Sequence, residues 1–86
     1  MSRYSTRGTA WVRRNARQRI AAWVREGQNI SVWQHLVAFR RDYDPDISYE
    51  DRLHFDFQIR AMQDRMRLLV TWIRNEMIRV PNWRDR

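Results

Sequence analysis

Residues 49–80 read YEDRLHFDFQIRAMQDRMRLLVTWIRNEMIRV, a stretch that contains neither glycine nor proline. Its apolar residues recur at spacings of four and three, the heptad-like pattern of a helix that packs along its whole length. They are Phe55, Ile59, Met62, Met66, Leu69, Ile73, Met77 and Val80. Ser48 and Asp51 have the spacing of a capping box, and Pro81 prevents continuation at the far end. The sequence therefore predicts one long helix over residues 49–80.

A second apolar stripe follows the same predicted helix, about 150° away when each residue turns about 100°. Its members are Leu53, Phe57, Ala61, Leu68 and Trp72. The shorter helices expected upstream can cover one stripe but hardly both. A chain of 86 residues also buries only a thin core, and without cysteine no disulfide can reinforce it. The second stripe therefore predicts self-association or a protein partner.

The first half of the chain predicts two short helices separated at Gly27. Thr9 is a candidate N-cap for a helix that runs to about Glu26, with Gly27 in the C′ position that glycine favours. The predicted inner stripe of this helix is Val12, Ala16, Ile20 and Trp23. Ser31 begins a capping box for a second helix, which stops before Pro45. Its predicted inner face is Val32, Leu36, Phe39 and Tyr43, broadened by Trp33 and Val37.

These elements predict an all-α fold in which a helical hairpin packs on one long C-terminal helix and the chain self-associates. A single small domain spans residues 1–86, with a basic N-terminal arm at about residues 1–8. An alternative is a helix-turn-helix around residues 27–30 that presents Gln34, His35, Ala38 and Arg41 to a DNA major groove. Plain helix-on-helix packing is the favoured interpretation, because the second helix ends among aspartates that phosphates would repel.

All seventeen basic side chains are arginines, and the net charge is +7. Residues 1–25 carry seven arginines and no acid, residues 26–64 carry four arginines and eight acids, and residues 65–86 carry six arginines and two acids. Arginine keeps its charge and binds phosphate or carboxylate through two parallel hydrogen bonds. The uneven distribution is typical of a segment that binds a polyanion or drives assembly.

Several kinds of chemical site are excluded by composition or spacing. Without cysteine there is no thiol catalysis and no Cys-type zinc site. The alternating acids of residues 42–50 resemble half of a calcium loop, but Ile47 stands where glycine is needed and Leu53 where glutamate is needed. The two histidines, His35 and His54, lie on different predicted helices, and two isolated glycines cannot form a phosphate-binding loop. We expect no enzyme, no cofactor and no metal site.

The sequence thus predicts a small non-enzymatic protein that binds nucleic-acid phosphates, DNA or RNA, with little sequence readout. The candidate contact residues are Arg3, Arg7, Trp11, Arg13, Arg14, Arg17, Gln18 and Arg25. The alternative is a protein-binding adaptor or inhibitor that docks on an acidic partner through Arg and Trp hot spots. The lysine-free and cysteine-free composition suits a phage or another mobile element in either class.

No run approaches the ~18 consecutive apolar residues of a transmembrane helix, so we expect no stable membrane insertion. The expected location is cytoplasmic or otherwise intracellular. Mitochondrial targeting is a minor alternative, because residues 1–25 are arginine-rich, acid-free and amphipathic. A membrane-surface role for the first helix is a further minor alternative, since tryptophan and arginine occur together on it.

Overall fold

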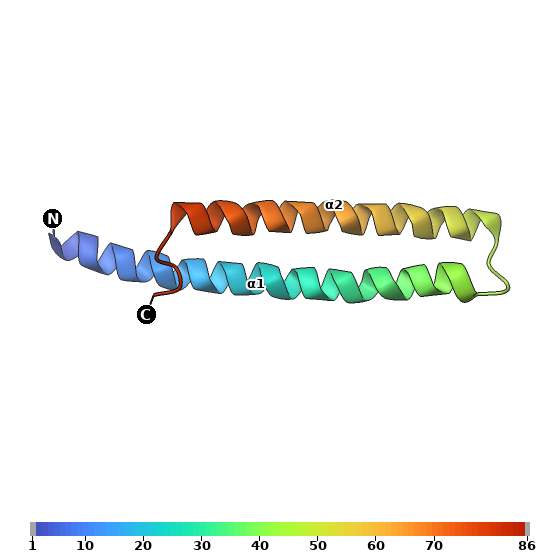
Figure 1. The fold of residues 1–86 in the computed structure, drawn as a ribbon, viewed down its shortest axis with the longest axis horizontal. Coiled ribbons are helices and arrows are strands. Elements are labelled where there is room, and N and C mark those ends of the chain that lie inside the picture. Colours follow the sequence, from blue (N-terminus) through green and yellow to red (C-terminus); the bar gives the residue numbers. More distant parts are fainter. Residues whose placement is uncertain (1, 86) are drawn as a thin grey trace.

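The computed structural model describes the backbone of residues 2–85 and the side chains of residues 10–85. Two helices account for most of it, α1 over Ser2–Tyr43 and α2 over Tyr49–Arg79. They pack side by side in opposite directions, and the turn at residues 44–48 joins them at one end (Figure 1). The first part of α1 extends past the end of α2. The prediction of an all-α fold is confirmed, but the first half of the chain forms one helix where the sequence predicts two.

The predicted break at Gly27 is wrong, because α1 continues through it without a positive φ. The caps expected at Thr9 and Ser31 are wrong for the same reason, and no turn remains at residues 27–30 to build a helix-turn-helix. One row of residues at alternating spacings of four and three crosses the glycine and is buried or half-buried. It consists of Ala16, Ile20, Trp23, Gly27, Ile30, Gln34, Val37 and Arg41. Packing of this row on α2 outweighs the helix penalty of one glycine, about 1 kcal/mol.

Continuity of α1 also reverses the predicted orientation of its second half. Leu36 lies sixteen residues after the buried Ile20, which places it about 160° away around the helix. The stripe expected to face inward is therefore exposed, and Ile30, Gln34 and Val37 lie nearer to α2. The exposed stripe is Val32, Leu36, Phe39 and Tyr43.

The sequence prediction for α2 is confirmed. The Ser48 hydroxyl accepts a hydrogen bond from the Asp51 backbone N–H at 3.1 Å, and the helix ends at Arg79, two residues before Pro81. The core that α2 forms with α1 is thin. Among the described side chains, its buried apolar residues are Ala16, Ile20, Leu69 and Val80.

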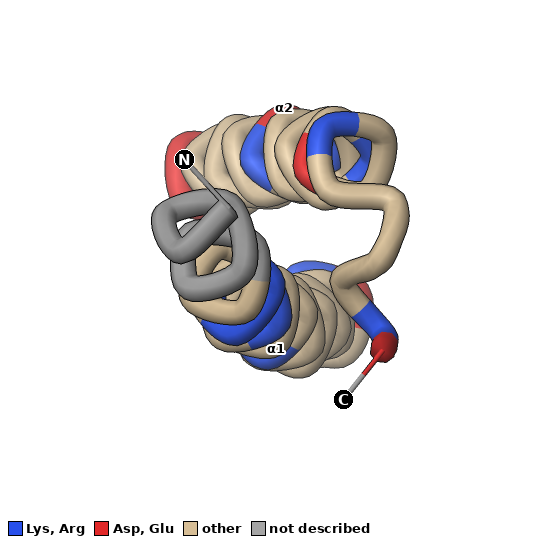
Figure 2. The backbone as a smooth tube through the Cα atoms, turned by 90° about the vertical axis from the view of Figure 1, so that its left-hand side faces the viewer, with Lys and Arg blue, Asp and Glu red and all other residues tan. Residues whose placement is uncertain are grey.

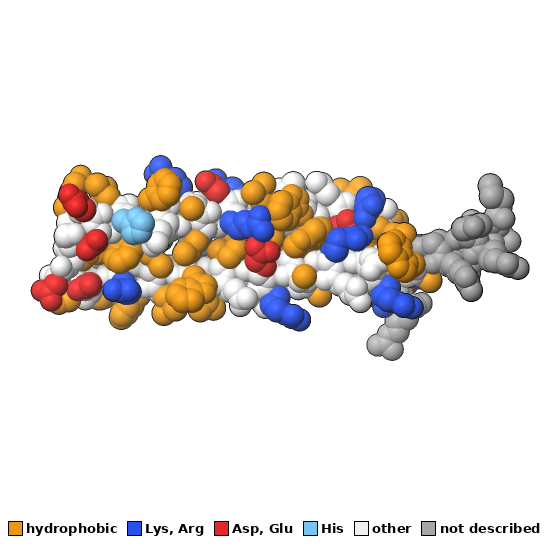
Figure 3. Space-filling view, turned by 180° about the vertical axis from the view of Figure 1, so that it is seen from behind, with side chains coloured by type: hydrophobic (Ala, Val, Ile, Leu, Met, Phe, Trp, Pro, Cys, Tyr) orange, Lys and Arg blue, Asp and Glu red, His pale blue; other side chains and the backbone are white. Residues whose placement is uncertain are grey.

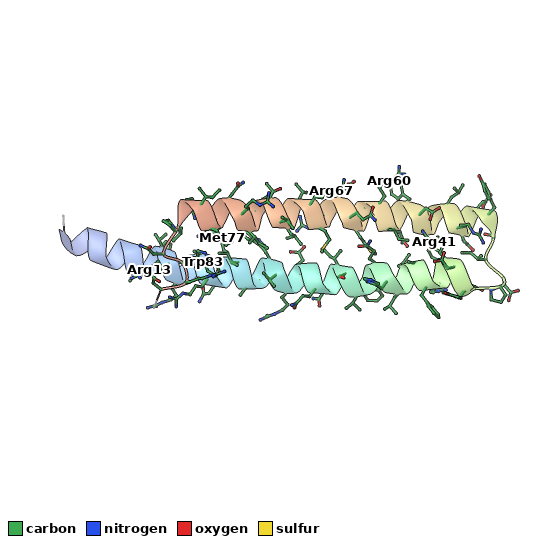
Figure 4. All side chains as sticks on the ribbon, in the orientation of Figure 1. Arg13, Arg41, Arg60, Arg67, Met77 and Trp83 are labelled. Carbon is green, nitrogen blue, oxygen red and sulfur yellow. The ribbon has the colours of Figure 1, made fainter. Side chains whose placement is uncertain are left out.

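The resulting molecule is a rod, 66 Å long and 17 by 13 Å across at the level of its Cα atoms. Side chains line the space between the two helices along the hairpin, with Met77 and Arg41 near opposite ends (Figure 4). Within residues 2–85, no helix combines the length and the apolar character that crossing a membrane requires.

Candidate functional site

The antiparallel arrangement gathers most of the positive charge at one end of the rod. Residues 1–25 carry +7 and residues 65–86 carry +4, and the hairpin places the later part of the first segment beside the second. The intervening residues 26–64, with a charge of −4, form the end with the turn. Figure 2 looks along the rod from the basic end and shows the C-terminal segment returning from α2 to the side of α1. The molecule therefore has a basic end and an acidic end.

Some arginines at the basic end hold the helices together. Glu76 is only 7% exposed, and its Oε1 accepts hydrogen bonds from Arg19 of α1 and from Arg79, the latter at 2.8 Å. The hydrogen bonds from Arg79 and Arg19 lower the pKa of the Glu76 carboxyl, although its burial acts in the opposite direction. Arg19 therefore joins α1 to α2 through Glu76, whereas the hydrogen bond from Arg79 lies within α2.

A second cross-helix contact lies nearer the middle of the rod. Arg65 donates two hydrogen bonds to Glu26 Oε1, at 2.8 and 2.9 Å. Its guanidinium lies 4.8 Å from the ring centroid of Trp72, which in turn is 5.9 Å from that of Trp23. The Arg65–Glu26 hydrogen bonds and the Trp72–Trp23 ring contact join α1 to α2, whereas the cation–π contact of Arg65 with Trp72 lies within α2.

Three of the predicted contact arginines meet at a shallow pocket at the basic end. The pocket is lined by Ala10, Arg13, Arg14, Arg17 and Asp85. The turn after α2 completes it, because the Trp83 N–H donates to the Val80 carbonyl at 3.1 Å and the Trp83 carbonyl accepts from Arg17 Nε. Arg13 and Trp83 accordingly lie close together in Figure 4. Helix α1 supplies the basic groups, and the C-terminal turn supplies the opposite wall.

Two nitrogens of this pocket's arginines lack a hydrogen-bond acceptor among the residues that the structure describes. Arg13 Nε and Arg17 Nη2 are both buried, and neither has a partner among the described residues. A buried donor without an acceptor costs about 1–3 kcal/mol. An oxyanion has several acceptor oxygens and a charge opposite to that of the guanidinium groups. The pocket is therefore chemically suited to a phosphate or carboxylate group, although the Asp85 carboxylate reduces its positive potential.

The remaining predicted contact residues do not line this pocket. Trp11, Gln18 and Arg25 are exposed on α1, and Arg25 follows the exposed Arg14 by eleven residues, about three helical turns, so the two share a face. The side chains of Arg3 and Arg7 lie outside the described residues. The predicted contact surface is thus a row along one side of α1 with the pocket beside it.

Two features of the surface were not predicted from the sequence. Asp85 lines the pocket and the Trp83 carbonyl holds Arg17 beside it, and no local pattern in the C-terminal segment marks either residue. Arg60, Arg67 and Arg74 form a row on α2, where spacings of seven residues place them about 10.5 Å apart. Figure 4 shows Arg60 and Arg67 directed away from α1. The seven-residue repeat of arginine was visible in the sequence and could have revealed this row.

The residues predicted for self-association occupy a flank of α2. Leu53, Phe57, Ala61 and Leu68 are exposed, whereas Trp72 is half-buried against Trp23. Hydrophobic side chains also gather over both helices on the face seen in Figure 3, between the charged groups.

The turn between the helices is organised by its own charges. Arg41 donates to Asp42 at 2.9 Å and to Asp56 of α2 at 2.8 Å, and the hydrogen bond from Arg41 lowers the pKa of Asp42. The Asp44 carboxylate accepts from the Asp46 N–H at 3.0 Å. In the part of the chain that the structure describes, no group of three or more His, Asp or Glu side chains is placed to hold a metal ion.

A comparison with known protein families, with curated proteins and with solved structures finds no match.

Proposed function

We propose that this protein binds nucleic-acid phosphates through its basic end. The observation that carries the proposal is the pocket that brings the guanidinium groups of Arg13, Arg14 and Arg17 together at the basic end. A phosphate would accept hydrogen bonds from the exposed Arg14, and a chain of phosphates would also meet the exposed Arg25 further along α1. The pocket is the anchor, and the row along α1 extends the contact.

This mode of binding favours the phosphate backbone over the bases. The contacts proposed here come from arginines along one side of a straight helix, and backbone contacts of this kind position a protein without reading sequence. Their energy comes mainly from the release of counterions, so affinity depends steeply on salt. We therefore expect similar binding to unrelated sequences.

We also propose that the chain self-associates. The radius of gyration is 19.1 Å, whereas about 12 Å is expected for a compact chain of this length. The accessible surface is 7315 Å², compared with about 5,500 Å² for a compact monomer of this mass. A two-helix hairpin with so few buried side chains gains stability by burying more of that surface.

A protein-binding adaptor remains the second candidate function. The observation that favours it is the exposure of two large indoles, Trp11 near the basic end and Trp33 further along α1. Tryptophan and arginine are the side chains most enriched at interface hot spots. An acidic protein surface would then occupy the position proposed for phosphates.

The test measures affinity for mixed-sequence duplex DNA and for RNA at several salt concentrations. Each phosphate contact on duplex DNA contributes about 0.9 to the slope of log affinity against log salt, so Arg14→Ala should lower the slope by about one for every sequence. Arg52→Ala is the matched control, because Arg52 is an exposed arginine near the acidic turn, and it should leave the slope unchanged.

The variant Arg14→Lys separates the two candidate functions. It should retain much of the affinity if Arg14 meets a phosphate as a point charge, and it should lose most of it if Arg14 makes a bidentate or stacked contact in a protein interface. Absence of binding to both DNA and RNA at low salt would refute the nucleic-acid proposal.

A further inference from the structure

The outer face of α1 carries an apolar stripe that the hairpin does not cover. It consists of Val32, Leu36, Phe39 and Tyr43, which are 59%, 51%, 62% and 71% exposed, and we call it the outer seam. The rings of Phe39 and Tyr43 are 4.7 Å apart, and an apolar groove lies beside them, lined by Ser31, Val32, His35, Leu36 and Phe39. The seam points away from α2, which therefore does not cover it.

The spacing of the outer seam is suited to pairing with itself. Its members are separated by four, three and four residues, a pattern that is the same in both directions along the helix. Two copies related by a twofold axis would therefore place Val32 against Tyr43 and Leu36 against Phe39 in an antiparallel pair. A twofold interface requires such a self-complementary surface. The excess surface of the monomer, about 1,800 Å² over a compact chain, also exceeds the ~800 Å² that each partner buries in a standard interface.

Charge favours the antiparallel direction. Arg25 lies seven residues before Val32 and shares its side of α1, whereas the acidic turn with Asp44 and Asp46 follows Tyr43 directly. In an antiparallel pair each Arg25 approaches the acidic turn of the other copy. A parallel pair would place arginine beside arginine and acid beside acid, which is unfavourable.

We infer that a second copy of this chain docks on the outer seam, with the two α1 helices antiparallel. This inference rests on the self-association part of the proposed function and assigns its surface. The flank of α2 is less suitable, because Asp64 and Arg65 interrupt its stripe and Trp72 already contacts Trp23 and Arg65. The outer seam has no charged member.

The geometry of this dimer bears on nucleic-acid binding. The centre of the seam lies about 23 residues from Arg14, or about 35 Å along α1. The two arginine pockets therefore lie at opposite ends of the dimer, about 70 Å apart. One dimer would contact phosphates at two well-separated places, on one long molecule or on two.

The first experiment measures the dimer dissociation constant by analytical ultracentrifugation of the full chain. Leu36→Glu should raise it roughly a hundredfold, because each dimer then buries two unpaired carboxylates. Leu68→Glu, an equivalent change on the exposed flank of α2, should leave it unchanged. Both residues are exposed in the hairpin, so each variant should still fold, and circular dichroism checks that it does.

The second experiment tests the direction of the pair, using the absence of native cysteine. Val32→Cys and Tyr43→Cys variants are prepared separately, mixed and oxidised. The antiparallel pair predicts a disulfide between the two variants and little cross-linking of either variant with itself.

Three outcomes would overturn the inference, and each leads to a different conclusion. Loss of the dimer in Leu68→Glu but not in Leu36→Glu would assign self-association to α2. Cross-linking of Val32→Cys with itself would show a parallel pair. A monomer at all concentrations would refute self-association altogether, and DNA binding by that monomer would still support the phosphate proposal.

Discussion

Replacement of Gly27 by alanine tests the continuity of α1 directly. Gly27 lies in the middle of the helix, where glycine is less favourable than alanine by about 1 kcal/mol. A Cβ at this position would lie 3.6 Å from Met66 Sδ and 3.9 Å from Leu69 Cδ1, both ordinary contact distances. The new methyl group therefore fits without displacing α2 and adds a few favourable contacts. We expect Gly27→Ala to stabilise the protein by about 0.5–1 kcal/mol.

The expected change is large enough to measure by thermal unfolding. For a chain of this length the entropy of unfolding is about 0.18 kcal/mol/K, so 1 kcal/mol raises the Tm by about 5 °C. Circular dichroism at 222 nm follows the transition, and wild type and variant are compared at equal protein concentration because association also raises the Tm. Ala21→Gly is the matched control, since Ala21 is exposed on α1, and it should lower the Tm by a similar amount.

The opposite result would refute the reasoning. If Gly27 ended a helix in the left-handed region, a Cβ would be strained there, and Gly27→Ala would lower both the Tm and the helical content. A decrease in Tm caused by Gly27→Ala would instead support the three-helix arrangement that the sequence predicts.

Two further predictions concern the contacts of α2. Glu76→Gln should lower the free energy of unfolding by about 1–2 kcal/mol at pH 7, because it replaces a buried carboxylate that accepts from Arg19 and Arg79. The pKa of Glu76 is lowered by folding from its ordinary 4.5, so this stabilisation is present above about pH 4.5 and is lost as the pH falls through the lowered value. Urea titrations of both proteins between pH 7 and pH 2 measure it, and a pH-independent difference would contradict the assigned role. Ser48→Ala should lower the Tm by about 5 °C through loss of the N-cap hydrogen bond, whereas Ser48→Asp should retain most of the stability. Equal Tm values for the wild type and both variants would contradict the role of Ser48 as the N-cap.

The candidate site was only partly predictable from the sequence. Counting charges identified the basic segment and Arg13, Arg14 and Arg17 within it. The contribution of Trp83 and Asp85 was not predictable, because it depends on the hairpin bringing the C-terminal turn back to the first half of α1. Sequence reasoning also assigned no structural role to Arg19, which pairs with a glutamate 57 residues away.

The sequence by itself determined the helical character of the chain and the limits of α2. Ser48 and Pro81 act within a turn of their own positions, and the four-three spacing between them is the signature of one continuous packed stripe. These signals are local, so they can be interpreted from the sequence without knowledge of the rest of the fold.

The tertiary structure decided whether Gly27 ends a helix and which face of residues 30–43 is buried. A glycine penalty of about 1 kcal/mol is small beside the packing of α2 along both halves of α1. Once α1 is continuous, the buried Ala16 and Ile20 set the phase of every later residue. The more hydrophobic stripe through Leu36 then lies outside, and a row containing Gln34 lies inside, because a rigid helix cannot rotate one half to suit its local hydrophobicity.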